Sequence, residues 1–129
     1  MSPPTPAPLD YLPAEESFHD PLRADAGEPD KAKAVVIPFG LEASVSYGGG
    51  TAAGPAAILA ASHQLELFDE EVWREPYLDY GIAAVREPKI AGSIEDALAQ
   101  LEGLVGQVLE ERRFPLVLGG EHSLTAGAI

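Results

Sequence analysis

The segment FPLVLGGEHS, residues 114–123, is the most informative stretch of this chain for its fold. Its first half is a short apolar run, which predicts a buried β-strand. Its second half places an acid, a histidine and a hydroxyl residue directly after two glycines. Open α/β sheets bind their ligands at the carboxyl ends of parallel strands, so these polar residues fall where a site is expected. His122 is a candidate metal ligand, because a neutral imidazole held by a rigid strand suits transition metals.

The residues around His122 favour a binding site but leave a structural role open. Gly119 and Gly120 have no side chains, so another group can come close to the imidazole. Glu121 is either an exposed loop acid or a hydrogen-bond acceptor that supports the site, and Ser123 is a helix cap or an orienting hydroxyl. No catalytic nucleophile is assigned, because the motif Gly-x-Ser-x-Gly is absent. From these residues alone, a structural role and a metal-ligand role explain His122 equally well.

Apolar or alternating segments recur along the chain and predict a series of strands. The expected strands are residues 34–39, 65–68, 80–83 and 116–118. The first of them is apolar and β-branched throughout, which is typical of a strand buried on both faces of a parallel sheet.

Two helices are predicted between these strands. Pro55 suits the first position of a helix that runs to His63. Ser93 caps a longer helix, with Asp96 three positions later in a variant capping box. Its apolar stripe consists of Ile94, Leu98, Leu101, Val105 and Val108. A strand, a helix and a strand with long connections imply a right-handed crossover, so the fold class is α/β with a mainly parallel sheet.

Length and composition narrow the classes of protein. A chain of 129 residues is expected to form one domain. The net charge of −13 argues against nucleic acid and anionic membranes as partners, and it attracts cationic substrates. No apolar run approaches the roughly 20 residues of a transmembrane helix, and the first residues do not resemble a signal peptide. The absence of cysteine fits a cytoplasmic protein.

Residues 1–33 differ in composition from the rest and are predicted to form a proline-rich extended arm before a domain at 34–129. Seven of the twelve prolines lie in this segment. Four apolar residues could attach it to a neighbouring molecule or to the domain surface: Tyr11, Leu12, Phe18 and Leu22. His19, also in the arm, is expected to be exposed, whereas His63 is expected to have a packing or surface role.

A glycine triplet at 48–50 lies in the long loop after the first strand. It is no phosphate loop, because no Gly-Lys-Ser/Thr sequence follows. Two interpretations stay open, namely a flexible loop and a backbone wall of a site or subunit contact.

Two segments together resemble the N-terminal part of the ureohydrolase family, which includes arginases and agmatinases, and they are more similar to agmatinases. The first has IPF at 37–39, SYGGGT at 46–51 and GPAAI at 54–58. The second is LVLGGEHS at 116–123. The resemblance covers residues 34–129.

This resemblance implies a three-layer α/β/α sandwich around a mainly parallel sheet. It also implies two Mn²⁺ ions bridged by a hydroxide, which attacks the guanidinium carbon of agmatine and releases urea and putrescine. His122 would be a ligand of one manganese, with Glu121 and Ser123 as supporting groups and Gly119 and Gly120 in the site loop. A homo-oligomer is expected for the intact form.

The chain departs from the family pattern in its metal ligands. The motifs Asp-Ala-His-x-Asp and Asp-x-Asp-x-x-Asp-Pro are absent, and Leu59 replaces an arginine that often follows Gly-Pro-x-x-Ile. We therefore expect a truncated, N-terminal portion of an agmatinase-like hydrolase that is inactive as an isolated chain. Two alternatives stay open: a non-catalytic fragment or pseudoenzyme that binds a full-length homologue, and another hydrolase of the family that acts on a different guanidino compound or on a formimidoyl compound such as formimidoyl-glutamate.

Overall fold

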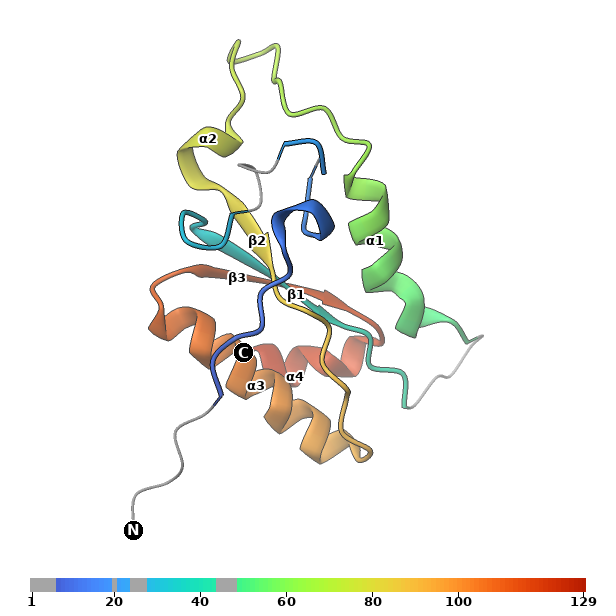
Figure 1. Ribbon diagram of the computed structural model, residues 1–129. Helices are drawn as coiled ribbons and strands as arrows, with labels where there is room; N and C mark the ends of the chain where they lie inside the picture. The colour runs from blue at the N-terminus through green and yellow to red at the C-terminus, as the bar shows by residue number, and fades with distance from the viewer. Residues whose placement is uncertain (1–6, 20, 24–27, 44–48) are drawn as a thin grey trace.

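Three parallel strands form the sheet at the centre of the fold (Figure 1). They are β1 (Ala34–Phe39), β2 (Ile82–Ala84) and β3 (Phe114–Gly119), in the order β2-β1-β3. The computed structural model describes residues 7–19, 21–23, 28–43 and 49–129. The predicted strands at 34–39 and 116–118 are confirmed, and so is the parallel sheet.

Strand β1 is central and almost completely buried. Val35, Ile37 and Phe39 face one layer, where they pack against the long helix α3 (Ile94–Glu110) and Leu124. Val36 faces the opposite layer with Leu59 of helix α1 (Gly54–Ser62) and part of the N-terminal segment. Helices thus cover both faces of the sheet, which makes a partial three-layer α/β/α sandwich.

Helix α3 begins where the sequence predicts. The Ser93 hydroxyl accepts a hydrogen bond from the Asp96 backbone N–H at 3.1 Å, which satisfies one of the free donors of the first turn. The fully or mostly buried face consists of Ala97, Leu101, Val105 and Val108. Ile94 and Leu98 of the predicted stripe are only half-buried.

Shorter elements connect these parts. They are η1 (Ala14–Glu16), η3 (Thr51–Ala53), α2 (Tyr77–Tyr80), η4 (His122–Leu124) and α4 (Thr125–Ala128). Helix α4 lies against α3, where Gly127 is close to the Leu98 backbone and leaves no room for a side chain.

Three predictions of strands need correction. Residues 65–68 are not a strand, because no described segment pairs with them and their alternation alone cannot hold an isolated strand. The segment 80–83 starts with the end of α2, and its strand begins only at Ile82. Strand β3 is half-exposed rather than buried, with Leu116 41% exposed, because among the described residues only β1 pairs with it.

The N-terminal segment docks along the β2 side of the sheet. The Leu12 backbone N–H donates to the Ala84 carbonyl at 2.8 Å, and Tyr11 forms an antiparallel bridge with Val85. The Leu22 side chain is 89% exposed, and His19 is half-buried rather than exposed. The segment therefore covers one edge of the sheet, while the domain boundary at residue 33 stays a prediction.

Burial of α3 against the sheet predicts a position-dependent loss of stability. Leu101→Ala should lower the free energy of unfolding by about 2–5 kcal/mol, because it leaves a cavity beside β1. The matched change Leu109→Ala removes an exposed side chain of the same helix and should cost less than about 0.5 kcal/mol. Urea unfolding followed by circular dichroism measures both, and equal losses would contradict this packing.

Docking of the N-terminal segment predicts a loss of stability at high pH. Burial and the hydrogen bond to the Glu111 carboxylate, at 3.1 Å, raise the pKa of Tyr11 to about 12. Since the folded-state pKa lies above the unfolded value of about 10, this contribution is complete below pH 10 and is lost as the pH rises toward 12. In urea unfolding between those pH values, the free energy of unfolding should decline less for Tyr11→Phe than for the unchanged protein. An unchanged decline would show that Tyr11 is not linked to folding.

Candidate functional site

The carboxyl ends of β1 and β3 bring two loops together. Phe39 pairs with Gly119 in the sheet register, so the residues that follow each strand leave the same edge. The Glu121 backbone N–H donates to the Leu41 carbonyl at 2.8 Å, and the Glu121 carboxylate accepts a hydrogen bond from the Ala43 N–H. Glu121 thus joins the loop after β3 to the loop after β1.

The glycine pair allows this close approach. A side chain on Gly120 would collide with the backbone of Leu41, and one on Gly119 would collide with the Leu124 side chain. The space beside both glycines is therefore occupied by the chain itself. Among the described residues the pair lets the two loops pack, and the prediction that it also admits another group near the imidazole stays a prediction.

His122 is exposed at the start of η4. Its Nδ1 lies 3.1 Å from the Thr125 hydroxyl, a hydrogen bond that orients the ring. Ser123 is also exposed, and its hydroxyl caps neither η4 nor α4. The structure therefore presents the imidazole of His122 to solvent at the end of β3 instead of packing it in the core.

The described residues fit one metal ligand and not a complete metal site. Among residues 7–19, 21–23, 28–43 and 49–129, no three His, Asp or Glu side chains gather closely enough to hold an ion. A neutral imidazole is a common metal ligand, but a catalytic metal site needs several donors. The described residues by themselves do not bring together enough donors to position a metal for chemistry.

Glu42 is a further residue of this edge, and sequence reasoning missed it. One of its carboxylate oxygens accepts hydrogen bonds from the Gly50 N–H at 2.5 Å, the Thr51 N–H at 2.9 Å and the Thr51 hydroxyl at 3.2 Å. Glu42 therefore closes the loop that contains the glycine triplet. In the sequence, only its position between an apolar strand and a glycine run could have indicated this role, and such a position is a weak signal. The segment 44–48 lies outside the described residues.

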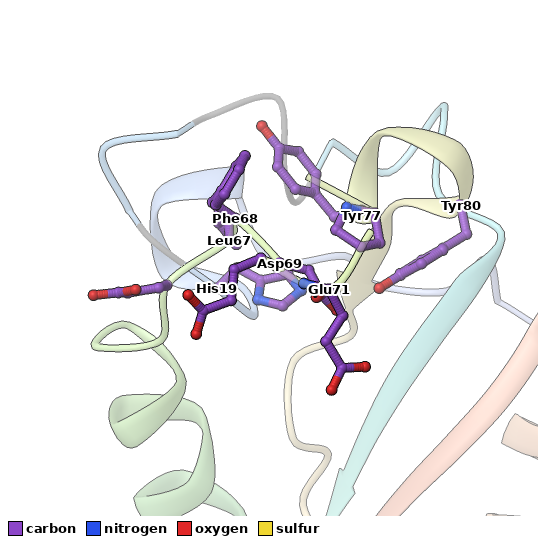
Figure 2. A pocket seen from close by; sticks show the side chains of 10 residues that line it. His19, Leu67, Phe68, Asp69, Glu71, Tyr77 and Tyr80 are labelled. Atoms are coloured by element: carbon purple, nitrogen blue, oxygen red, sulfur yellow. Dashed lines mark hydrogen bonds between the residues drawn. The ribbon is translucent and has the colours of Figure 1, made fainter. Parts of the chain in front are cut away.

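The other two histidines lie elsewhere. His63 Nε2 is 2.9 Å from the Ser17 carbonyl, in agreement with a packing role. His19 lines a surface pocket of about 590 Å³ with acidic and aromatic residues, including Asp69 and Tyr77 (Figure 2). Burial lowers the pKa of His19, so the neutral ring is favoured there.

This pocket lies at the opposite end of the sheet from His122. Tyr80, which lines it, accepts a hydrogen bond at its carbonyl from the Lys33 N–H at 2.6 Å, directly before β1. The pocket is thus at the amino ends of the strands, whereas ligands of parallel sheets bind at the carboxyl ends. We therefore place the candidate site at His122.

Comparison with known proteins identifies the family. Residues 32–129 match the Arginase family, and this range includes both loops of the carboxyl edge. The chain belongs to the arginase family. It is 34% identical over 105 residues to the N(1)-aminopropylagmatine ureohydrolase of Synechocystis sp., an alignment that covers 76% of this chain and 34% of that protein. It is 32% identical over 99 residues to the agmatinase of Bacillus cereus, covering 72% and 32% of the two chains.

A solved structure supports the same assignment. The agmatine ureohydrolase of Thermoplasma volcanium matches with a TM-score of 0.72 and 29% identity, over 81% of this chain and 36% of that chain. The arginase-like fold predicted from the sequence is thereby confirmed. The chain spans about a third of the length of the curated relatives that it matches. Within the described residues, no helix is long and apolar enough to cross a membrane.

Close packing of the two loops predicts a specific sensitivity at Gly120. Gly120→Ala should lower the free energy of unfolding by about 1–3 kcal/mol, because the new methyl group collides with the Leu41 backbone. Gly106→Ala is the control, since a methyl group there meets nothing within 4 Å and should stabilise α3 by up to about 1 kcal/mol. Urea unfolding compares the two, and a neutral Gly120→Ala would show that the loops do not pack in this way.

Proposed function

We propose that this chain is the N-terminal portion of an agmatinase-like manganese ureohydrolase. The observation that carries the proposal is the family match over 32–129, which includes an exposed imidazole at the carboxyl end of β3. In this proposal His122 is one manganese ligand. When bound, manganese supplies a hydroxide nucleophile near neutral pH.

The neighbouring residues of His122 act by positioning in this proposal. Glu121 ties the loop after β3 to Ala43 and Leu41, which determines where the His122 backbone lies. Gly119 and Gly120 permit that contact, and Ser123 is available to support a ligand from the exposed edge.

The proposed substrate is a guanidino compound with a positively charged aliphatic chain, such as agmatine. Water adds to the guanidinium carbon, the bond from that carbon to the chain nitrogen breaks, and urea and a primary amine are released. The names of the relatives support this class, since they are agmatinases and N(1)-aminopropylagmatine ureohydrolases. The net charge of −13 also favours a cationic substrate. A cytoplasmic homo-oligomer is the proposed form of the intact enzyme.

A second candidate is a non-catalytic chain that binds a full-length homologue. The half-exposed β3 supports it, because a strand edge offers unpaired N–H and C=O groups to another chain. Reading the gene downstream of codon 129 separates the two. An Asp-Ala-His-x-Asp motif in the same frame supports the hydrolase, and a natural stop codon supports the binding role.

The isolated chain is predicted to be inactive and to bind manganese weakly through one imidazole. With Mn²⁺ and either agmatine or N(1)-aminopropylagmatine, urea release should not exceed the rate without protein. In NMR spectra, Mn²⁺ should broaden the signals of residues near His122, and His122→Ala should remove this broadening. His63→Ala is the matched control and should retain it. Turnover by the pure chain would contradict the predicted inactivity, and broadening that survives His122→Ala would contradict the ligand role.

A further inference from the structure

A rigid turn projects from the amino end of the sheet. The backbones of Asp69 and Arg74 exchange two hydrogen bonds, at 2.8 and 3.2 Å. The Asp69 carboxylate also accepts from the Glu71 N–H at 2.8 Å, and the Arg74 guanidinium pairs with Asp79. This turn, residues 68–74, therefore has a defined shape without packing into the core.

The turn displays two aromatic rings to solvent. Trp73 is the chain's one tryptophan and is 76% exposed, while Phe68 is 47% exposed. The rings pack edge to face with their centroids 5.3 Å apart, which limits their motion. Exposed tryptophan on a preorganised turn is typical of the energetic centre of a protein–protein interface, since little entropy is lost on binding. We call residues 68–74 the aromatic turn.

Negative charge surrounds the aromatic turn. Glu66, Glu70 and Glu71 are exposed, and Figure 2 shows Glu71 and Phe68 on the same pocket. Like charge on two copies of this turn disfavours a direct contact of turn with turn. A partner surface must instead be apolar at its centre and basic at its rim.

The chain itself carries such a surface. Four of its eight Lys and Arg residues lie shortly before the start of β1 or β3: Lys31, Lys33, Arg112 and Arg113. Lys33 and Arg112 are exposed, and Phe114 beside them is 66% exposed. The Phe114 N–H donates to the Lys33 carbonyl at 2.7 Å, which holds the apolar and basic residues together. We call Lys33, Arg112 and Phe114 the basic edge.

We propose that the aromatic turn of one copy binds the basic edge of a second copy. Trp73 and Phe68 cover Phe114, while Glu70 and Glu71 face Lys33 and Arg112. The contact joins two different surfaces, so it can occur twice in a reciprocal pair, in which each turn meets the other copy's edge, or continue into a ring or chain of copies. It does not depend on the hydrolase activity proposed above.

Trp73 reports directly on this contact, because it is the chain's one tryptophan and its indole can be excited apart from the four tyrosines. As protein concentration rises, its emission should shift to shorter wavelength over the same range in which sedimentation shows association. Raising the salt from about 50 to about 500 mM should weaken association at least about tenfold. A monomer at all concentrations would overturn the proposal. So would association without a shift of Trp73 emission, which is the result expected for pairing through the β3 edge.

A charge exchange tests the two surfaces separately. Glu70→Lys with Glu71→Lys should weaken self-association at least about tenfold, and so should Lys33→Glu with Arg112→Glu. An equimolar mixture of the two variants should associate again, because each contact then joins opposite charges. The pair Glu95→Lys with Glu102→Lys, on exposed positions of α3, is the control for the change in net charge and should retain association. Failure of the mixture to associate while both variants remain folded would overturn the proposal.

Discussion

The pairing of β1 with both of its neighbours is the constraint on which the rest of the structure depends. Ala34 pairs with Ile82 on one side and with Phe114 on the other, so one register aligns all three strands. Side chains of β1 alternate between two apolar layers, and helices cover both faces. The same register ends β1 and β3 together, which brings Glu121 to the backbone of the loop after β1.

The two edges of this sheet have different environments. The N-terminal segment hydrogen-bonds beside β2 through Leu12 and bridges to Val85 through Tyr11, so it occupies the outer side of that edge. Strand β3 has a neighbour on one side only among the described residues, although its sequence is as apolar as that of a buried strand. This contrast is consistent with a chain that spans about a third of its curated relatives. The exposed edge of β3 is also the reason why a binding role is proposed as an alternative to the hydrolase role.

At the candidate site, many hydrogen bonds hold the backbone of the loops, but few of the described side chains are available to bind a metal or substrate. Glu42 and Glu121 each use their carboxylates to hold backbone N–H groups of nearby loops. These acids stabilise the shape of the edge, and His122 is the exposed group that the shape presents. The described residues therefore account for how one ligand is positioned, while a complete metal centre requires donors that they do not bring together.

Local patterns in the sequence predicted the strands at 34–39 and 116–118, the cap at Ser93 and the family, because apolar runs, capping residues and the motif at 119–123 act over short distances. The strand predicted from the short alternation at 65–68 was wrong, because a strand forms only where a partner strand lies beside it. Only the tertiary structure decided that the glycine pair serves loop packing, that Glu42 closes the glycine loop, and that Trp73 faces solvent. The contact of Gly120 with Leu41 joins segments far apart in the chain, and a local pattern contains no information about which distant segments meet. Whether Glu42 reaches Gly50 and Thr51, and whether Trp73 is covered, likewise depends on how the chain is arranged in space.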